Sequence, residues 1–198
     1  MKSPALLVLV AVLVAACAKP KLKEGELPDP PQRLYQRGLS FLPPAEKDWW
    51  IAQKRDDSLV IARLGKVEGD THAIEASLIR LPAFGSSFER HQFVKASREK
   101  AVPAPRFRIR AHELSDQLVD TTTCTVSYLL LEDRQPDTGT NTIGAVLVES
   151  VSLVCAHPRN SSAGTMLTYT HRSYPEDQDR AFRARAGAVL GTFQFDEL

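Results

Sequence analysis

Two apolar, β-rich runs near the middle of the chain constrain its fold more than any other feature. Residues 121–132 and 144–156 both favour β-strands, and a polar stretch rich in turn-forming residues separates them. In an antiparallel hairpin with Cys124 opposite Cys155, the turn centres on residues 139–140, inside that stretch. The same register pairs Val126 with Leu153, Tyr128 with Val151 and Leu130 with Glu149. The sequence therefore predicts a long central hairpin in this register.

Other β-type segments precede and follow the hairpin. Strands are predicted at residues 49–54, 59–64, 71–81, 106–112, 165–171 and 193–195. In residues 106–112, alternation predicts one face made of Phe107, Ile109 and Ala111 and another made of Arg106, Arg108, Arg110 and His112.

Two helices are predicted among these strands. Ser86 and Glu89 fit a capping box, in which the hydroxyl and the carboxylate each accept a hydrogen bond from a free amide, and the helix runs through Lys100. A second helix begins at Pro175. Its core-facing stripe is Phe182, Ala186, Val189 and Leu190. This order predicts an α+β domain: a mostly antiparallel sheet of about seven or eight strands with two helices packed on it.

The first residues have the anatomy of an export signal. Lys2 precedes an apolar run, residues 5–16, which is too short to span a bilayer, since that takes about 20 residues. The segment Val14-Ala15-Ala16-Cys17 resembles the lipobox of bacterial lipoprotein signal peptides. The resemblance implies that Cys17 is linked to diacylglycerol, that the chain is cut before Cys17, and that the new amino group is acylated. Two or three acyl chains hold a protein on a membrane, whereas one binds only marginally.

The same resemblance implies an address and a domain plan. The residue after Cys17 is Ala18 and not the aspartate that retains enteric lipoproteins in the inner membrane, so we expect the outer membrane, with the domain facing the periplasm. Residues 1–16 are then a removed signal peptide. Residues 17–34 are a lipidated cysteine and a proline-rich tether, and residues 35–198 are a single periplasmic domain.

Lipidation of Cys17 leaves Cys124 and Cys155 as the one possible cysteine pair. The periplasm is oxidising, and the hairpin register places the two cysteines opposite each other, so we expect a structural disulfide between them. A redox-active pair is the alternative, but it lacks the C-x-x-C spacing.

Residues 35–198 resemble proteobacterial envelope lipoproteins. The shared features are an early aromatic pair like Trp49-Trp50, two central strand cysteines, and a closing strand–helix–strand like residues 168–195. A looser likeness is to the fold of the extrinsic P subunit of photosystem II. Neither resemblance implies catalytic residues, and a shared fold does not determine function.

The chain has no sequence motif of a familiar catalytic, cofactor or metal site. A G-x-S-x-G elbow, a phosphate loop and a dinucleotide glycine fingerprint are all missing from the sequence. The five histidines, His72, His91, His112, His157 and His171, have no metal-ligand spacing. His72 and His112 lie on predicted strand faces, where we expect surface or hydrogen-bonded side chains. The sequence therefore predicts no catalytic residues, no metal and no cofactor, and the net charge of +1 favours no nucleic-acid partner.

Two features are candidate contact sites. The row Arg106, Arg108 and Arg110 could bind an anionic envelope component, although a solvated face that discourages edge pairing is the simpler interpretation. Trp49 and Trp50 point to opposite faces of a predicted strand, so one belongs to the core. The other is either covered by a helix or exposed as a docking residue.

These expectations together predict an outer-membrane lipoprotein that is not an enzyme but a binding or envelope-organising module. Its partners are the membrane, through the lipid anchor, and an envelope protein or anionic envelope component. Two alternatives stay open: an envelope hydrolase or transferase with residues scattered in sequence, and a binder of a small apolar ligand in a pocket between sheet and helices.

Overall fold

The computed structural model describes residues 25–67, 69–103, 105–135 and 145–198. The lipobox with Cys17, and most of the turn between the central strands, lie outside the described residues. Among the helices of the described part, none is long and apolar enough to cross a membrane.

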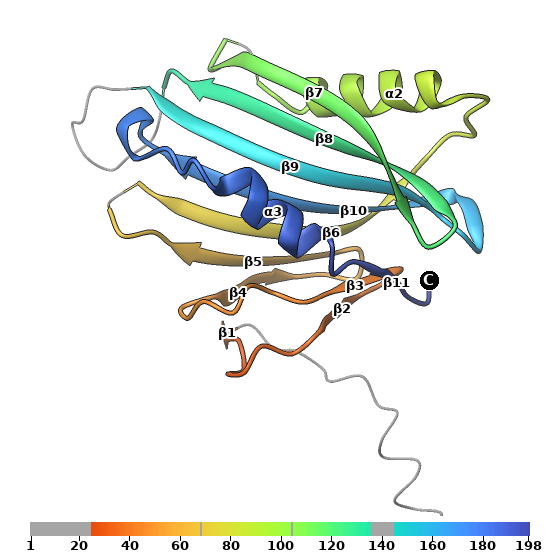
Figure 1. Cartoon of the computed structure of the whole chain (residues 1–198), viewed down its shortest axis with the longest axis horizontal. Coiled ribbons are helices and arrows are strands. Elements are labelled where there is room, and N and C mark those ends of the chain that lie inside the picture. Colours follow the sequence, from red (N-terminus) through yellow and green to blue (C-terminus); the bar gives the residue numbers. More distant parts are fainter. Residues whose placement is uncertain (1–24, 68, 104, 136–144) are drawn as a thin grey trace, which may run out of the picture.

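One large antiparallel sheet dominates the fold (Figure 1). Its eight described strands follow the spatial order β1-β4-β5-β6-β10-β9-β8-β7. In chain order they are β1 (Gly25–Glu26), β4 (Trp50–Lys54), β5 (Ser58–Leu64), β6 (Thr71–Arg80), β7 (Phe107–Val119), β8 (Thr122–Asp133), β9 (Val146–His157) and β10 (Asn160–Ser173). The predicted α+β class, with a mostly antiparallel sheet, is confirmed.

The predicted central hairpin is confirmed in register. β8 and β9 pair antiparallel, with Val126 opposite Leu153, Tyr128 opposite Val151 and Leu130 opposite Glu149. Cys124 and Cys155 form the expected disulfide, with Cα atoms 4.4 Å apart. Both cysteines are fully buried, so the bridge is part of the core.

A second, three-stranded sheet was not predicted. It has the order β11-β3-β2, formed by β2 (Leu34–Gln36), β3 (Leu39–Phe41) and β11 (Gln194–Phe195). Leu34, Leu39 and Phe41 are fully buried in the main core although their strands are only three residues long. The small sheet therefore joins the two ends of the domain.

The first helix, α2 (Ser87–Lys100), begins as predicted. The Ser86 hydroxyl accepts a hydrogen bond from the Glu89 amide, and the Glu89 carboxylate accepts one from the Gly85 amide at 2.7 Å. Both bonds satisfy donors at the helix start that have no partner within the helix.

The second helix begins later than predicted. Pro175–Asp177 form only a 3₁₀ turn, and α3 is Phe182–Leu190. The chain leaves the helical conformation at Gln178, and the Asp179 carboxylate then accepts a hydrogen bond from the Ala181 amide. The acidic segment thus ends the 3₁₀ turn and bonds an amide at the start of α3, so the turn and the helix are separate. The predicted stripe is confirmed, because Phe182, Ala186, Val189 and Leu190 are all buried.

The two helices cover opposite faces of the sheet. α3 packs on the face that carries Cys124 and Tyr128, in the main apolar core. α2 contacts the other face near β7 and β8 (Figure 1). There Arg90 reaches Thr125, and Val94 packs with Val154.

The predicted alternation of residues 106–112 is wrong beyond Ile109. A β-bulge at Arg110 shifts the register, so that Ile109 lies opposite Leu131 and Ala111 opposite Leu130. Ile109 and Ala111 therefore lie on opposite faces of the sheet. His112 consequently lies beneath α2 and not on a solvent face.

The predicted boundary of the tether at residue 34 is also wrong. β1 pairs with β4, Leu27 packs against the core, and Leu34 is fully buried. The guanidinium of Arg33 donates a hydrogen bond to the Thr192 carbonyl at 2.8 Å. Prolines exclude a helix from this segment, but they allow the extended path that brings Leu27 and Leu34 to the core. The folded domain therefore includes residues from Gly25 onward.

The revised boundary can be tested by a single truncation of a side chain. Leu34→Ala should lower the free energy of unfolding by about 3 kcal/mol, because it leaves a cavity in the core. Urea denaturation measures the change. Leu118→Ala is the control, since Leu118 is exposed on the far edge strand and should change stability by less than about 0.5 kcal/mol. Equal stability of the two variants would contradict the revised boundary.

Candidate functional site

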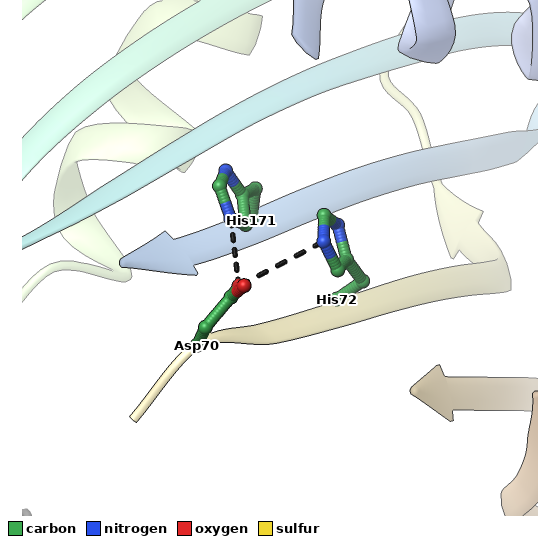
Figure 2. Close-up of side chains that lie close together, drawn as sticks. All are labelled: Asp70, His72 and His171. Carbon is green, nitrogen blue, oxygen red and sulfur yellow. Dashed lines mark hydrogen bonds and ion pairs between the residues drawn. The ribbon is translucent and has the colours of Figure 1, made fainter. Parts of the chain in front are cut away.

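A cluster of one aspartate and two histidines lies at one end of the β6–β10 pair (Figure 2). His171 Nε2 is 2.8 Å from Asp70 Oδ1, and His72 Nε2 is 3.8 Å from the same oxygen. The two imidazole rings are stacked, with centroids 4.3 Å apart. The side chains of His72 and His171 are 4% and 3% exposed, whereas that of Asp70 is 16% exposed. The cluster is therefore buried, with Asp70 on its solvent side.

Strand register brings the two histidines together. His72 on β6 lies directly opposite His171 on β10, and both point to the α3 face. Asp70 ends the turn before β6, which is closed by a hydrogen bond from the Gly65 amide to the Asp70 carbonyl. A Cβ atom at residue 65 would lie 1.8 Å from Asp70 Oδ2, so only glycine there lets the carboxylate take this position.

Aromatic rings enclose the cluster. Tyr169 places its hydroxyl 3.4 Å from His72 Nδ1, on the side of the ring away from Asp70. The ring of Trp49 lies 6.4 Å from that of His72, and the ring of Phe182 lies 5.7 Å from that of His171. His171 Nδ1 is buried and has no hydrogen-bond partner among the described residues.

Burial and nearby charges determine the protonation of His72. Removal from water, then the neighbouring His171 and the Arg63 guanidinium, lower the pKa of His72 to about 4, against a smaller opposing effect of Asp70. His72 is therefore neutral at pH 7. Burial likewise raises the pKa of Tyr169 to about 12, so its hydroxyl stays protonated.

An apolar cleft lies beside the cluster, between α3 and the loop that follows β3. Its volume is about 600 Å³. The lining residues are Leu42, Pro43, Pro44, Ala45, Glu46, Tyr169, Arg185, Ala188, Val189 and Thr192. Arg185 is ion-paired with Asp179 at its rim. Tyr169 joins the two features, because it lines the cleft and its hydroxyl faces His72.

A second hollow, of about 660 Å³, lies on the other side of the same loop. It is lined by residues 27–29, 31, 43–50 and 64–65. Trp50 is half-buried there, whereas Trp49 is buried in the core. Trp49 is thus the core residue of the pair, whereas Trp50 lines a hollow to which no described helix contributes a residue.

A Ser–His–Glu arrangement occurs on the opposite face of the sheet, beneath α2. His112 Nε2 is 3.0 Å from Ser127 Oγ, and His112 Nδ1 is 3.0 Å from Glu99 Oε1. This geometry matches the relay of a nucleophile, a base and an orienting carboxylate. Ser127 is fully buried, however, so no substrate outside the protein reaches its hydroxyl in this conformation. The three side chains instead tie α2 to the sheet.

The arginine row is largely engaged in ion pairs. Arg106 forms a two-point pair with Asp133, with N–O distances of 2.9 and 2.7 Å, and Arg110 pairs with Glu132 at 2.8 Å. Arg108 is exposed and makes no ion pair with a residue that the structure describes. Two of the three arginines are therefore ion-paired with carboxylates of β8, which the sequence pattern did not predict.

No sequence pattern predicted the Asp70–His72–His171 cluster. Both histidines lie in predicted strands, and His72 was expected to be a surface or hydrogen-bonded residue. Their contact depends on pairing between strands that are far apart in sequence, since Asp70 and His171 are 101 positions apart. The one local signal is Gly65, the glycine that lets the carboxylate turn toward the sheet.

Comparison with known proteins identifies the fold but no family. No protein-family model matches the chain, and neither does any curated protein sequence. The structure of the Ran-binding protein Mog1p of Saccharomyces cerevisiae aligns with a TM-score of 0.50 and 10% identity, over 84% of this chain and 96% of that one. Cyanobacterial PsbP (CyanoP) of Synechocystis sp. PCC 6803 aligns with a TM-score of 0.49 and 12% identity, over 90% of this chain and 98% of that one. At 10% identity, the likeness to Mog1p shows a shared fold alone.

The lowered pKa of His72 predicts acid sensitivity. Between pH 6.5 and 4 the unfolded chain protonates His72 while the folded chain does not, so folding stability falls as the pH falls through this window. A difference of one proton gives a slope of up to about 1.4 kcal/mol per pH unit. The charged and titratable groups near His72 are Asp70, His171, Arg63, Arg185 and Tyr169.

Urea denaturation at several pH values, in the presence of a chelator, measures this dependence. His72→Gln removes the titrating group, so its stability should change less steeply than that of the wild type over the same range. Parallel curves for the two proteins would show that His72 does not carry the effect.

Proposed function

We propose that this protein is a lipid-anchored, non-catalytic binding module of the bacterial envelope, and that the cleft beside α3 receives its partner. The cleft is the observation that carries the proposal. It is open to solvent and predominantly apolar, with Glu46 and the Arg185–Asp179 pair at its rim. Such a surface gains binding energy by excluding water, and the charged rim gives orientation.

The fold is compatible with partner binding. The yeast protein that shares it is a Ran-binding protein. The catalytic alternative has less support, because the serine of the Ser127–His112–Glu99 arrangement is buried and the Asp70–His72–His171 cluster does not line the cleft.

The envelope location rests on the lipobox-like segment ending at Cys17. The Cys124–Cys155 disulfide supports it, because such bridges persist in oxidising compartments. Gly25 already pairs with β4, and the eight-residue step from Cys17 to Gly25 reaches at most about 29 Å even when fully extended. The domain would therefore work close to the membrane surface, nearer than a tether running to residue 34 would place it.

Metabolic labelling with a palmitate analogue tests the anchor. The wild type should become labelled and partition with membranes. Cys17→Ala should be unlabelled and accumulate as an uncleaved or soluble form, because the acceptor thiol is gone. An unlabelled wild-type protein would end the anchor hypothesis without bearing on the cleft.

Photo-crosslinking in intact cells tests the cleft. A photoreactive amino acid at Ala188, an exposed α3 residue of the cleft, should give a specific adduct. The same amino acid at Ala96 is the matched control, since Ala96 is an exposed alanine of α2 on the opposite face.

The product at Ala188 distinguishes the kinds of partner. A protein adduct supports a partner-binding module, and a small adduct identified by mass spectrometry supports the small-ligand alternative. Equal adducts at Ala188 and Ala96, or none at Ala188, would contradict binding in the cleft.

A further inference from the structure

We propose that Asp70, His72 and His171 form a binding site for a divalent transition-metal ion of the zinc class. Two imidazoles and one carboxylate are the ligand types that such ions prefer, with a fourth position left for water. The proposed metal site depends neither on the lipid anchor nor on a partner in the cleft.

The three donor atoms lie within 4.8 Å of one another. Both Nε2 atoms face the same carboxylate oxygen, Asp70 Oδ1, at 2.8 and 3.8 Å (Figure 2). A tetrahedral zinc ion with bonds of 2.0–2.1 Å spaces its donors about 3.3 Å apart, which is midway between these two distances. The rings are parallel to within 4°, so their lone pairs run along parallel lines, and binding of the ion requires the rings to tilt toward each other.

The surroundings of the three side chains are suited to holding a metal ion. Tyr169 lies beside His72 Nδ1, where its hydroxyl holds the ring from outside, as the outer partners of metal-binding histidines do. Gly65 provides the space for the Asp70 carboxylate. Asp70 is also the most exposed of the three residues, so it provides the route of entry and the open coordination position.

Two cations lie near the site. Arg185 is ion-paired with Asp179, which offsets its charge, whereas Arg63, over the Trp49 ring, keeps its charge and opposes binding of an ion at His72. On the other side, Glu149 lies directly opposite His171 in the sheet and adds negative charge to this region.

Titration of the chelator-treated protein with Zn²⁺ tests the site. Calorimetry should give one ion per chain. Asp70→Asn and His72→Gln should each weaken binding at least tenfold, since even the outer partners of metal ligands contribute 10- to 100-fold. His91→Gln is the matched control, because His91 pairs with Asp116 at the surface in a similar His–carboxylate contact and should leave binding unchanged.

A measurement on the unaltered protein covers the case in which a variant fails to fold. Co²⁺ bound at the cluster should quench tryptophan emission, because the Trp49 ring lies 6.4 Å from that of His72, and Zn²⁺ should restore the emission by displacement. Near-UV circular dichroism checks the fold of each variant. Absence of stoichiometric binding by the wild type, an unquenched Trp49 on Co²⁺ binding, or variants of Asp70 and His72 that fold and bind like the wild type would each overturn the proposal.

Discussion

The pairing of β6 with β10 is the interaction on which the rest of the structure depends. The strands β1, β4, β5 and β6 form one half of the sheet, and β7 to β10 form the other. Among the described strands, only the ladder from Ala163–Arg80 to Arg172–Thr71 joins the two halves in the large sheet. That ladder closes the core beneath α3, with Ile74 opposite Tyr169, and it sets His72 against His171. Its register is determined by burial, because a slip of one residue would move the core residues of β10 to the opposite face.

The two faces of the sheet are stabilised in different ways. α3 contributes a compact apolar stripe, so burial of apolar surface holds it in place. α2 buries only Val94 and is held by side-chain hydrogen bonds: Arg98 to Ser150, Arg90 to Thr125, and His112 to both Glu99 and Ser127. Both ring nitrogens of His112 are hydrogen-bonded, as buried polar groups generally are, so the Ser–His–Glu arrangement is best explained as part of this interface.

The accuracy of the sequence predictions follows the range of the interactions involved. The cap at Ser86 and the stripe of α3 depend on neighbours in the chain, and the register of Val126 and Leu153 depends on two successive strands. All three predictions are confirmed. The bulge at Arg110 was missed because alternation alone cannot show where an extra residue interrupts a ladder. The strands around Leu34 and Phe41 were missed because three-residue strands carry too few residues for a periodic pattern, and their burial depends on β11 at the far end of the chain.

Local pattern thus determined the class of fold, the central hairpin with its disulfide and the buried face of the last helix, because each results from side-chain periodicity within one or two adjacent elements. The tertiary structure alone decided that Asp70, His72 and His171 meet, that Tyr169 lies between them and an apolar cleft, and that the proline-rich start of the domain belongs to the core. The physical reason is distance along the chain. Contacts between residues about a hundred positions apart arise from the packing of complete strands, and no short stretch of sequence encodes the packing by itself.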